Sequence, residues 1–232
     1  MQRPANYISW RDETPEGFVF SVKGGRFITH LKRLKDVEIP LANFFASGVL
    51  ALREKLGPIL WQLPERHAFD ADQLTSFFAL LPRTTTEALA LAKKHDARLE
   101  NRDWLESQPE RPIRYALEAR HPGFIGHTVA TLLRDNDIAF VVADTAGIWP
   151  QNREVTSDFV YVRLHGAEEL YASGYTSAAL DSWAADIRTW MASGRDVYVY
   201  FDNDVKVRAP FDALGLAERL GVAWPPPGSL QP

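Results

Sequence analysis

Cysteine is absent from all 232 residues of the sequence. Its absence excludes disulfide bonds, thiol nucleophiles and thiolate metal sites. Long apolar segments are also missing, because no run approaches the roughly 18 to 20 residues that a membrane helix needs. The first residues do not resemble a secretory signal peptide. Together these absences predict a cytoplasmic protein with no membrane partner.

An excess of positive charge is missing too. The formal net charge is −4, so the chain as a whole does not carry the electrostatic signature of a nucleic-acid coat. One local exception is the segment 23–35, which contains basic residues and no acidic residue. This segment predicts either a basic patch or an ordinary solvated face. Its basic residues are Lys23, Arg26, Lys32, Arg33 and Lys35.

Short segments rich in β-branched and aromatic residues recur along the chain, and helical patterns separate most of them. Several are apolar nearly throughout, as strands covered on both faces should be. Strands that alternate with helices indicate βαβ units and a parallel sheet. The predicted strands are Phe18–Lys23, Ile59–Leu63, Ile113–Glu118, Ala139–Ala143, Phe159–Leu164 and Val197–Phe201.

Capping residues and helix breakers mark the predicted helices. The segment Asp144–Asp158 has no helical period and is interpreted as a long loop. No repeat or linker divides the chain, which predicts one domain over residues 1–232 with a Pro-rich tail at 222–232. The predicted helices are Leu41–Leu56, one capped by Asp70 that runs to about Leu81, Glu87–His95 after caps at 84–86, Ser177–Ala192, and one from Pro210 to about Leu220.

Polar residues appear where each predicted strand ends. In parallel α/β folds, ligands bind at this carboxyl edge, because the loops there carry functional groups without disturbing the core. The sequence therefore predicts a polar pocket at the strand ends. Its candidate residues are Lys23, His30, Gln62, Glu118, Arg120, His121, Asp144, Arg163, His165, Asp202, Asn203 and Asp204.

Alternation of side chains within strands narrows this set. Arg163 and His165 share one side of their segment, and Glu118 and Arg120 share one side of theirs. If both sides face the same pocket, the two arginines bind an anion while Glu118 and His165 transfer protons. Asp204 is a further candidate acid or base. The alternative is an ion-pair network that only fills the mouth of a barrel.

Two other chemistries have weaker support. A divalent metal would find suitable ligand types, but no local spacing such as H-x-H or H-E-x-x-H supports one, so no metal site or cofactor is predicted. Glu118 and Asp144 resemble the carboxylate pair of a glycoside hydrolase in residue type alone. Dinucleotide, Walker and G-x-S-x-G motifs are absent. The residue types that suit a metal are those of His30, His121, His165, Glu118, Asp144 and Asp204.

Several blocks of the sequence match those of a known family in the same order. They are Phe18–Lys23, Phe27–His30, Leu56–Pro64, Glu118–His121, Val142–Asp144, Tyr161–Gly166 and Tyr198–Asp204. Over nearly its whole length the chain thus resembles the YecE-like family (domain of unknown function 72). The resemblance implies a TIM-barrel-like fold with a polar cavity at the strand ends, and it implies no established activity. A likeness to phosphate-cleaving barrels such as endonuclease IV is fold-level analogy.

Departures from the family pattern change what is expected of the barrel and of its pocket. Two strands that usually open the family have no counterpart here, which predicts about six of eight barrel strands. Homo-oligomerisation across the open edge would then cover the exposed sheet. The usual Arg-His-x-Ser-Trp run reads as 120–124 with Pro122 and Gly123 inside it. An Asn-Asn-Asp block reads Asp202-Asn203-Asp204, which adds a carboxylate to the pocket.

Three functions are left open at this stage. The first is a hydrolase that acts on a phosphate-bearing or nucleic-acid-derived ligand, with Glu118, His165 or Asp204 as acid or base. The second is a binding protein that holds an anionic ligand without turnover. The third is a truncated, inactive paralogue, or a gene whose start lies upstream of Met1.

Overall fold

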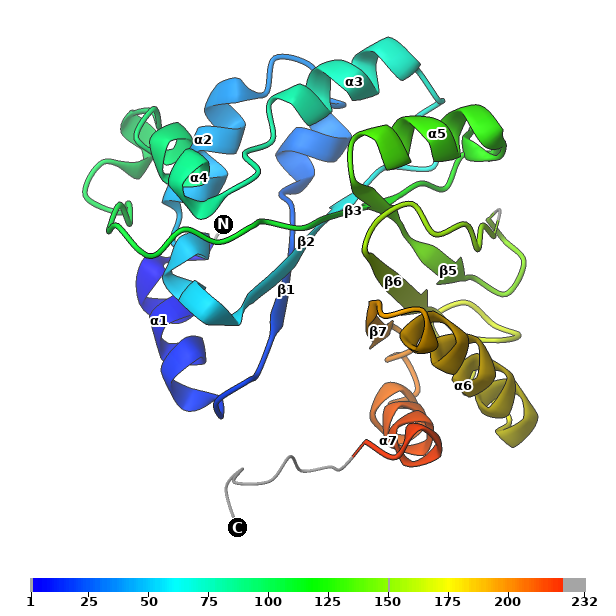
Figure 1. Ribbon diagram of the computed structural model, residues 1–232. Helices are drawn as coiled ribbons and strands as arrows, with labels where there is room; N and C mark the ends of the chain where they lie inside the picture. Colours follow the sequence, from blue (N-terminus) through cyan, green and yellow to red (C-terminus); the bar gives the residue numbers. More distant parts are fainter. Residues whose placement is uncertain (1, 150, 223–232) are drawn as a thin grey trace. The chain divides into compact units, whose positions relative to one another are not determined.

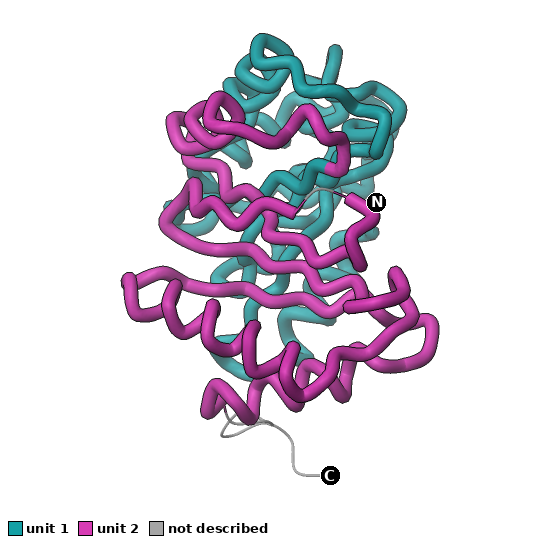
Figure 2. Tube along the Cα trace, turned by 90° about the vertical axis from the view of Figure 1, so that its right-hand side faces the viewer, with its two compact units in different colours: residues 1–119 teal, residues 120–232 magenta. Residues whose placement is uncertain are grey.

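Parallel strands alternate with helices in the computed structural model, which describes residues 2–149 and 151–222 (Figure 1). This arrangement confirms the predicted α/β class. The chain divides into two compact units, Met1–Ala119 and Arg120–Pro232 (Figure 2). Each unit is described by itself below.

The first unit contains three parallel strands in the order β1, β2, β3. Helices α2, α3 and α4 follow from the caps and apolar patterns of the sequence, whereas α1 lies in a stretch without a sequence-based prediction. Tyr7 is the buried residue of α1, so no apolar period marks this helix. The elements are α1 (Pro4–Glu13), β1 (Phe20–Lys23), η1 (Phe27–Leu31), α2 (Glu38–Ala46), η2 (Val49–Lys55), β2 (Leu56–Gln62), α3 (Ala71–Ala79), α4 (Thr85–Ala92), η3 (Ala97–Leu99) and β3 (Tyr115–Glu118).

The core of the first unit is built around Trp61, which is fully buried in β2. Its ring packs against Phe44 of α2 at 5.5 Å and Phe77 of α3 at 5.3 Å between ring centroids. The ring also approaches the backbone of Gly24, where a Cβ atom would lie 2.2 Å from Trp61 Cε3. Glycine is therefore required at the end of β1 by close packing.

The single helix predicted over Leu41–Leu56 is wrong, because the structure divides it into α2 and the 3-10 helix η2. Gly48 separates them with a φ of 110°, a value that a residue with a side chain rarely adopts. A Cβ atom at Gly48 would also lie 2.6 Å from Pro4 Cα of α1. The predicted caps of the next two helices are confirmed: Asp70 accepts from Gln73 N–H and Thr84 from Glu87 N–H.

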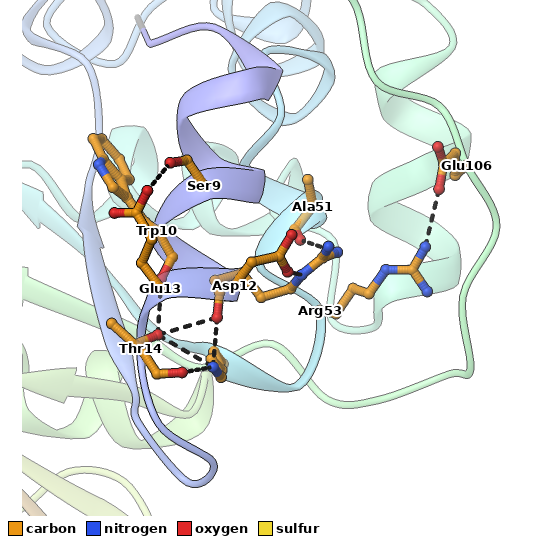
Figure 3. Close-up of polar contacts among 10 residues, drawn as sticks. Ser9, Trp10, Asp12, Glu13, Thr14, Ala51, Arg53 and Glu106 are labelled. Atoms are coloured by element: carbon orange, nitrogen blue, oxygen red, sulfur yellow. Dashed lines mark hydrogen bonds and ion pairs between the residues drawn. The ribbon is translucent and has the colours of Figure 1, made fainter. Parts of the chain in front are cut away.

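Lys55 ties η2 to the end of α1. Its ammonium donates to Arg11 O at 2.5 Å, Thr14 O at 2.6 Å and Thr14 Oγ1 at 3.2 Å. Figure 3 shows these contacts at Thr14, and the neighbouring contact in which Arg11 Nη1 donates to Ala51 O at 3.2 Å. Carbonyl groups at the end of a helix lack partners within the helix, so a buried cation there satisfies them.

The second unit contains a parallel sheet in the order β5, β6, β7. The strand predicted over Ala139–Ala143 is two short strands that are interrupted at Val141. Thr156 Oγ1 accepts from Phe140 N–H and donates to Ile138 O, so it satisfies the backbone of the first of them. The loop predicted over Asp144–Asp158 is confirmed for its described residues. The elements are η4 (Pro122–Phe124), α5 (His127–Asp135), β4 (Ile138–Phe140), β5 (Val142–Asp144), β6 (Phe159–Leu164), α6 (Ser177–Ala192), β7 (Asp196–Phe201) and α7 (Ala209–Leu220).

Helices α6 and α7 cover one face of this second sheet (Figure 1). Val160, Val162 and Leu164 of β6 pack toward Trp183 and the other apolar residues of these helices. Because side chains alternate along a strand, Tyr161 and Arg163 lie on the opposite face. Arg163 is the polar residue of β6 on this face, whereas Asp144 of β5 is the register partner of Leu164 and lies on the side that the helices cover.

Two expectations from the sequence concern membrane-spanning helices and the Pro-rich tail. Within residues 2–149 and 151–222, no helix is long and apolar enough to cross a membrane. The Pro-rich tail predicted at 222–232 lies, apart from Val222, outside the described residues.

Candidate functional site

Three predicted site residues of the second unit meet at one edge of its sheet. Asp144 ends β5, His165 follows β6 and Asp202 follows β7. The parallel register pairs Asp144 with Leu164, and Leu164 with Phe201, so the three strand ends coincide. Parallel strands deliver their carboxyl ends to one edge of a sheet, which is why these three residues lie at the same edge.

Asp202 stands between two nitrogen-bearing side chains. Its Oδ2 lies 2.6 Å from Arg163 Nη2 and 3.0 Å from His165 Nδ1. The Arg163 contact is a charge-assisted hydrogen bond. The His165 contact has hydrogen-bond length, but the two groups are not aligned as a hydrogen bond. The extra carboxylate noted in the sequence therefore balances the charge of Arg163.

His165 is completely buried. Within the described residues, its Nε2 atom has no hydrogen-bond partner. The rings of Tyr171 and Trp149 meet the imidazole edge to face, with centroids 5.3 Å and 6.5 Å away. A buried polar atom without a partner is rare in folded proteins and calls for a functional or structural explanation.

The backbone around His165 holds its position tightly. His165 N–H donates to Asp144 O at 2.9 Å, and its carbonyl accepts from Tyr171 N–H. The next residue, Gly166, has a φ of 117°, and a Cβ atom there would lie 2.4 Å from Glu169 O. The turn after β6 therefore requires glycine, and it fixes the direction in which His165 leaves the strand.

Arg120 belongs to the same unit and lies beside these rings. Its guanidinium carbon is 3.8 Å from the centroid of the Trp149 ring, and its Nη2 donates to Tyr171 Oη at 3.2 Å. Cation–π contact favours a planar guanidinium over an aromatic face and leaves the edges of the fork to form hydrogen bonds. Trp149 and Tyr171 were not predicted. The sequence signal for Trp149 was that it is an aromatic residue within the loop predicted over Asp144–Asp158.

Asn203 belongs to a separate buried group. Its Nδ2 donates to Ser173 O at 3.0 Å and to Asp212 Oδ2 at 2.7 Å, and Asp212 Oδ2 also accepts from Tyr175 N–H at 3.2 Å. These bonds join the loop after β7 to α7 and to the loop after β6. Asp212 was not predicted, because it lies inside a helix rather than at a strand end. The group supports the site without containing a reactive arrangement of its own.

Tyr175 lies near Asp144 within the second unit. Burial raises the pKa of the Tyr175 hydroxyl, and the neighbouring carboxylate of Asp144 raises it further. Tyr175 Oη accepts from Gly166 N–H at 3.2 Å. Tyr175 therefore stays protonated at neutral pH and holds the glycine turn in place.

Two other predicted residues of this unit, His121 and Asp204, have local contacts that do not involve His165. His121 Nδ1 accepts from Gly123 N–H at 3.0 Å and so caps the short helix η4. Asp204 is exposed, and its carbonyl accepts from Val207 N–H in a turn. The carboxylate that contacts His165 is Asp202, two residues earlier in the chain.

The remaining predicted residues lie in the first unit. Gln62 and Glu118 are register partners on β2 and β3, and both are buried. Lys23 is exposed at the end of β1, paired in register with Leu60. His30 lies in the π-helix η1, where its Nδ1 is 2.8 Å from Thr29 Oγ1. These strand ends meet at one edge of the first sheet, as predicted.

A metal centre finds no support in the residues that the structure describes. Among them, no group of three or more histidine, aspartate or glutamate side chains is arranged to hold an ion. His121 and Asp204, two of the ligand types considered from the sequence, have the local positions given above. The donor set around His165 contains one carboxylate and one imidazole.

The fold and site define an α/β protein with parallel sheets and polar groups at the strand ends. A family model described as "Protein of unknown function DUF72" matches residues 1–231, and the chain belongs to this family. The resemblance inferred from the sequence is thereby confirmed. A comparison with curated proteins finds no match.

Two solved structures of the family resemble the chain. A DUF72 family protein from Thermotoga maritima has 23% identity and a TM-score of 0.75, with 94% of this chain and 79% of that chain covered. One from Enterococcus faecalis has 15% identity and a TM-score of 0.70, with 96% and 86% covered. At these identities the likeness shows the fold, and the chemistry of the site rests on the residues described above.

Proposed function

We propose that the protein is a hydrolase for a small phosphate-bearing substrate, with His165 and Asp202 as its proton-transfer pair. The observation that carries this proposal is the contact of 3.0 Å between His165 Nδ1 and Asp202 Oδ2, combined with a buried Nε2 that lacks a partner within the described residues. A carboxylate that holds one imidazole nitrogen leaves the other to act as a base.

The chemistry assigns a role to each group. His165 Nε2 takes a proton from water, the water oxygen attacks phosphorus, and the bond from phosphorus to the leaving oxygen breaks. The leaving oxygen departs as an alcohol after it takes the proton from the His165 imidazolium, which restores the neutral imidazole. Asp202 stabilises the imidazolium that forms, and Arg163 keeps Asp202 ionised and oriented. A small rotation of either side chain aligns His165 with Asp202. Arg120, which lies beside the rings that cover His165, donates from its guanidinium to the phosphate oxygens.

Access to His165 requires movement, because the residue is completely enclosed in this structure. Trp149 and Tyr171 are the rings that cover it within the unit. In the proposed cycle, the substrate displaces one of these rings and places its phosphate beside Nε2. Closure of the rings then excludes bulk water, which strengthens the electrostatic interactions of the site.

The proposal retains the wider expectations from the sequence. Parallel β/α units in both parts of the chain support a barrel of the TIM type, and Glu118 remains the proposed second acid or base because it is a buried carboxyl at a strand end. Lys23, His30 and Gln62 remain proposed substrate contacts. A homo-oligomer remains a proposal for light scattering to test.

The test is an activity screen with matched variants. Candidate substrates are p-nitrophenyl phosphate, bis(p-nitrophenyl) phosphate and a short single-stranded oligonucleotide, each with and without divalent cations. We expect His165→Gln to lower kcat by roughly 10²- to 10⁴-fold, the usual contribution of a general base. The control His127→Gln changes an exposed histidine of α5, and kcat should stay unchanged.

The carboxylate is tested in the same way. Asp202→Asn should lower kcat and shift the pH profile of kcat/KM, whereas Asp204→Asn should leave both unchanged. Equal effects of Asp202→Asn and Asp204→Asn would contradict the assignment. Saturable binding of phosphate compounds with no turnover under any condition would overturn the hydrolase in favour of an anion-binding protein. If the protein neither bound nor hydrolysed phosphate compounds, the contacts among Arg163, His165 and Asp202 would have a structural role alone.

A further inference from the structure

The first unit contains a pocket that the proposed hydrolase does not use. Its volume is about 490 Å³, which lies within the range of roughly 300 to 1,000 Å³ for small-molecule sites. The pocket lies between η1, the start of α2 and the η3 segment. All of its lining residues belong to the first unit, whereas His165 and Asp202 belong to the second.

The pocket combines an apolar wall with a basic rim. Phe27, Ile28 and Phe44 line its apolar side, and Phe27 is 44% exposed, which is unusual for a large aromatic side chain. Arg26 and Lys32 line its polar side. Within the described residues, the side-chain nitrogens of Arg26 and Lys32 make no hydrogen bond or ion pair, so both cations are available to a ligand.

The acidic residues of the lining do not cancel this charge. Asp96 Oδ1 accepts from Arg98 N–H at 3.0 Å and from Asn43 Nδ2 at 3.2 Å, and its Oδ2 lies 3.7 Å from Arg98 Nε. Asp96 is therefore committed to capping η3 and to Arg98. Asp36 is the other acidic residue of the lining and is exposed at the rim.

The backbone around the pocket is held in uncommon conformations. Phe27 and Ile28 belong to the π-helix η1, a rare element that occurs frequently at functional sites. Arg33, Leu34 and Asp36 have φ values of 48°, 66° and 50°. Such strained residues persist where the surrounding packing fixes them, and they concentrate at ligand clamps and active sites. Here buried Leu34 anchors the loop that carries Lys32 and Asp36.

We infer that this pocket binds a mononucleotide. The base stacks on the exposed face of Phe27, because an aromatic side chain is a sequence-tolerant platform for any base. The phosphate lies between Arg26 and Lys32, which donate charge-assisted hydrogen bonds to it. Asp36 accepts a hydrogen bond from a sugar hydroxyl. The basic segment 23–35 noted in the sequence is then the phosphate side of this pocket.

The test is calorimetric titration of the full chain with adenosine monophosphate, adenosine and inorganic phosphate. We expect adenosine monophosphate to bind at least about 10-fold more tightly than either part alone, because both walls then contribute. Its affinity should fall as salt rises, since exposed charges are screened. Binding of inorganic phosphate as tight as that of adenosine monophosphate would overturn the assignment to a nucleotide.

Matched variants separate the two walls. Lys32→Gln and Arg26→Gln should each weaken the binding of adenosine monophosphate by about 10- to 100-fold and leave that of adenosine unchanged, as expected for loss of one charged hydrogen bond. Phe27→Ala should weaken adenosine monophosphate and adenosine by similar factors and leave inorganic phosphate unchanged. The control is Lys35→Gln, which removes the same charge from an exposed residue outside the lining.

Further outcomes would also overturn the inference. One is the absence of saturable binding of adenosine monophosphate to the unmodified chain. Another is an equal loss of affinity in Lys35→Gln and Lys32→Gln, because the charge would then act at long range rather than in the pocket. The last is binding of a single-stranded oligonucleotide without binding of the mononucleotide. Loss of adenosine monophosphate binding in His165→Gln would move the ligand to the proposed hydrolase site.

Discussion

Replacing Lys55 with methionine tests the contact that joins η2 to the end of α1. Methionine keeps much of the aliphatic length of lysine but removes the ammonium that donates to Arg11 O, Thr14 O and Thr14 Oγ1. Lys55 is 8% exposed, so water reaches the abandoned carbonyl groups poorly. The variant thus leaves buried acceptors without a donor, which is more costly than losing a solvated bond.

The expected loss follows from the number and type of these bonds. A hydrogen bond from a charged donor contributes about 1.5 to 3 kcal/mol net. The three bonds do not add, because they share one ammonium whose own burial is costly, and because Thr14 Oγ1 keeps its bond to Trp10 O at 2.8 Å. We therefore expect the free energy of unfolding to fall by about 2 to 4 kcal/mol. For a chain of this size the melting temperature would fall by about 5 to 15 °C.

Urea unfolding followed by tryptophan fluorescence measures this loss. The control is Lys94→Met, an exposed lysine in the same unit, whose effect should stay within about 0.5 kcal/mol. Lys55→Arg should recover part of the loss, because a guanidinium keeps the charge but presents its donors in a plane. A loss in Lys55→Met no larger than in Lys94→Met would refute the reasoning, since it would mean that water replaces the ammonium freely.

Two further predictions concern the packing of the first sheet and the buried tyrosines. Gly24→Ala should lower the free energy of unfolding by about 1 to 3 kcal/mol, because the new Cβ overlaps the ring of Trp61, and an additional Trp61→Leu substitution should restore part of it. Burial raises the pKa of Tyr115 and Tyr175 above the ordinary value of 10.0, so unfolding releases protons above that pH. Stability should therefore be unaffected by these tyrosines below about pH 10 and fall above it, by up to about 1.4 kcal/mol per pH unit for each. Tyrosinate absorbance and urea unfolding at matched pH would check this. Ionisation of every tyrosine near pH 10 with the fold intact would contradict it.

Much of the secondary structure followed from local patterns. The strand Phe159–Leu164 and the helix Ser177–Ala192 have the bounds that the sequence predicts, because a helical period and a run of β-branched residues depend on near neighbours. The caps Asp70 and Thr84 also act within three residues of the chain. Where a distant segment intervenes, the local pattern fails. The helix predicted over Leu41–Leu56 is interrupted at Gly48, whose space is limited by Pro4.

The candidate site likewise combines features that local sequence patterns predict with contacts that depend on distant segments. Arg163, His165 and Asp202 were found from the sequence because parallel strands deliver their ends to one edge. The sequence did not predict which carboxylate of the segment 202–204 contacts His165: Asp202 does so, whereas Asp204 is exposed. The path of the turn after β7 decides this, and no local pattern encodes that path.

By itself, then, the sequence determined the α/β class, the polar strand ends, the basic segment 23–35 and the family. Only the tertiary structure decided that Asp202 pairs with Arg163 and His165, and that Trp149 and Tyr171 cover the imidazole. The reason is physical. Periods and caps arise from interactions within a few residues. Arg163 and Asp202, in contrast, are 39 residues apart in the chain, and the loops that bring Trp149 and Tyr171 to His165 follow paths that depend on strand register and packing.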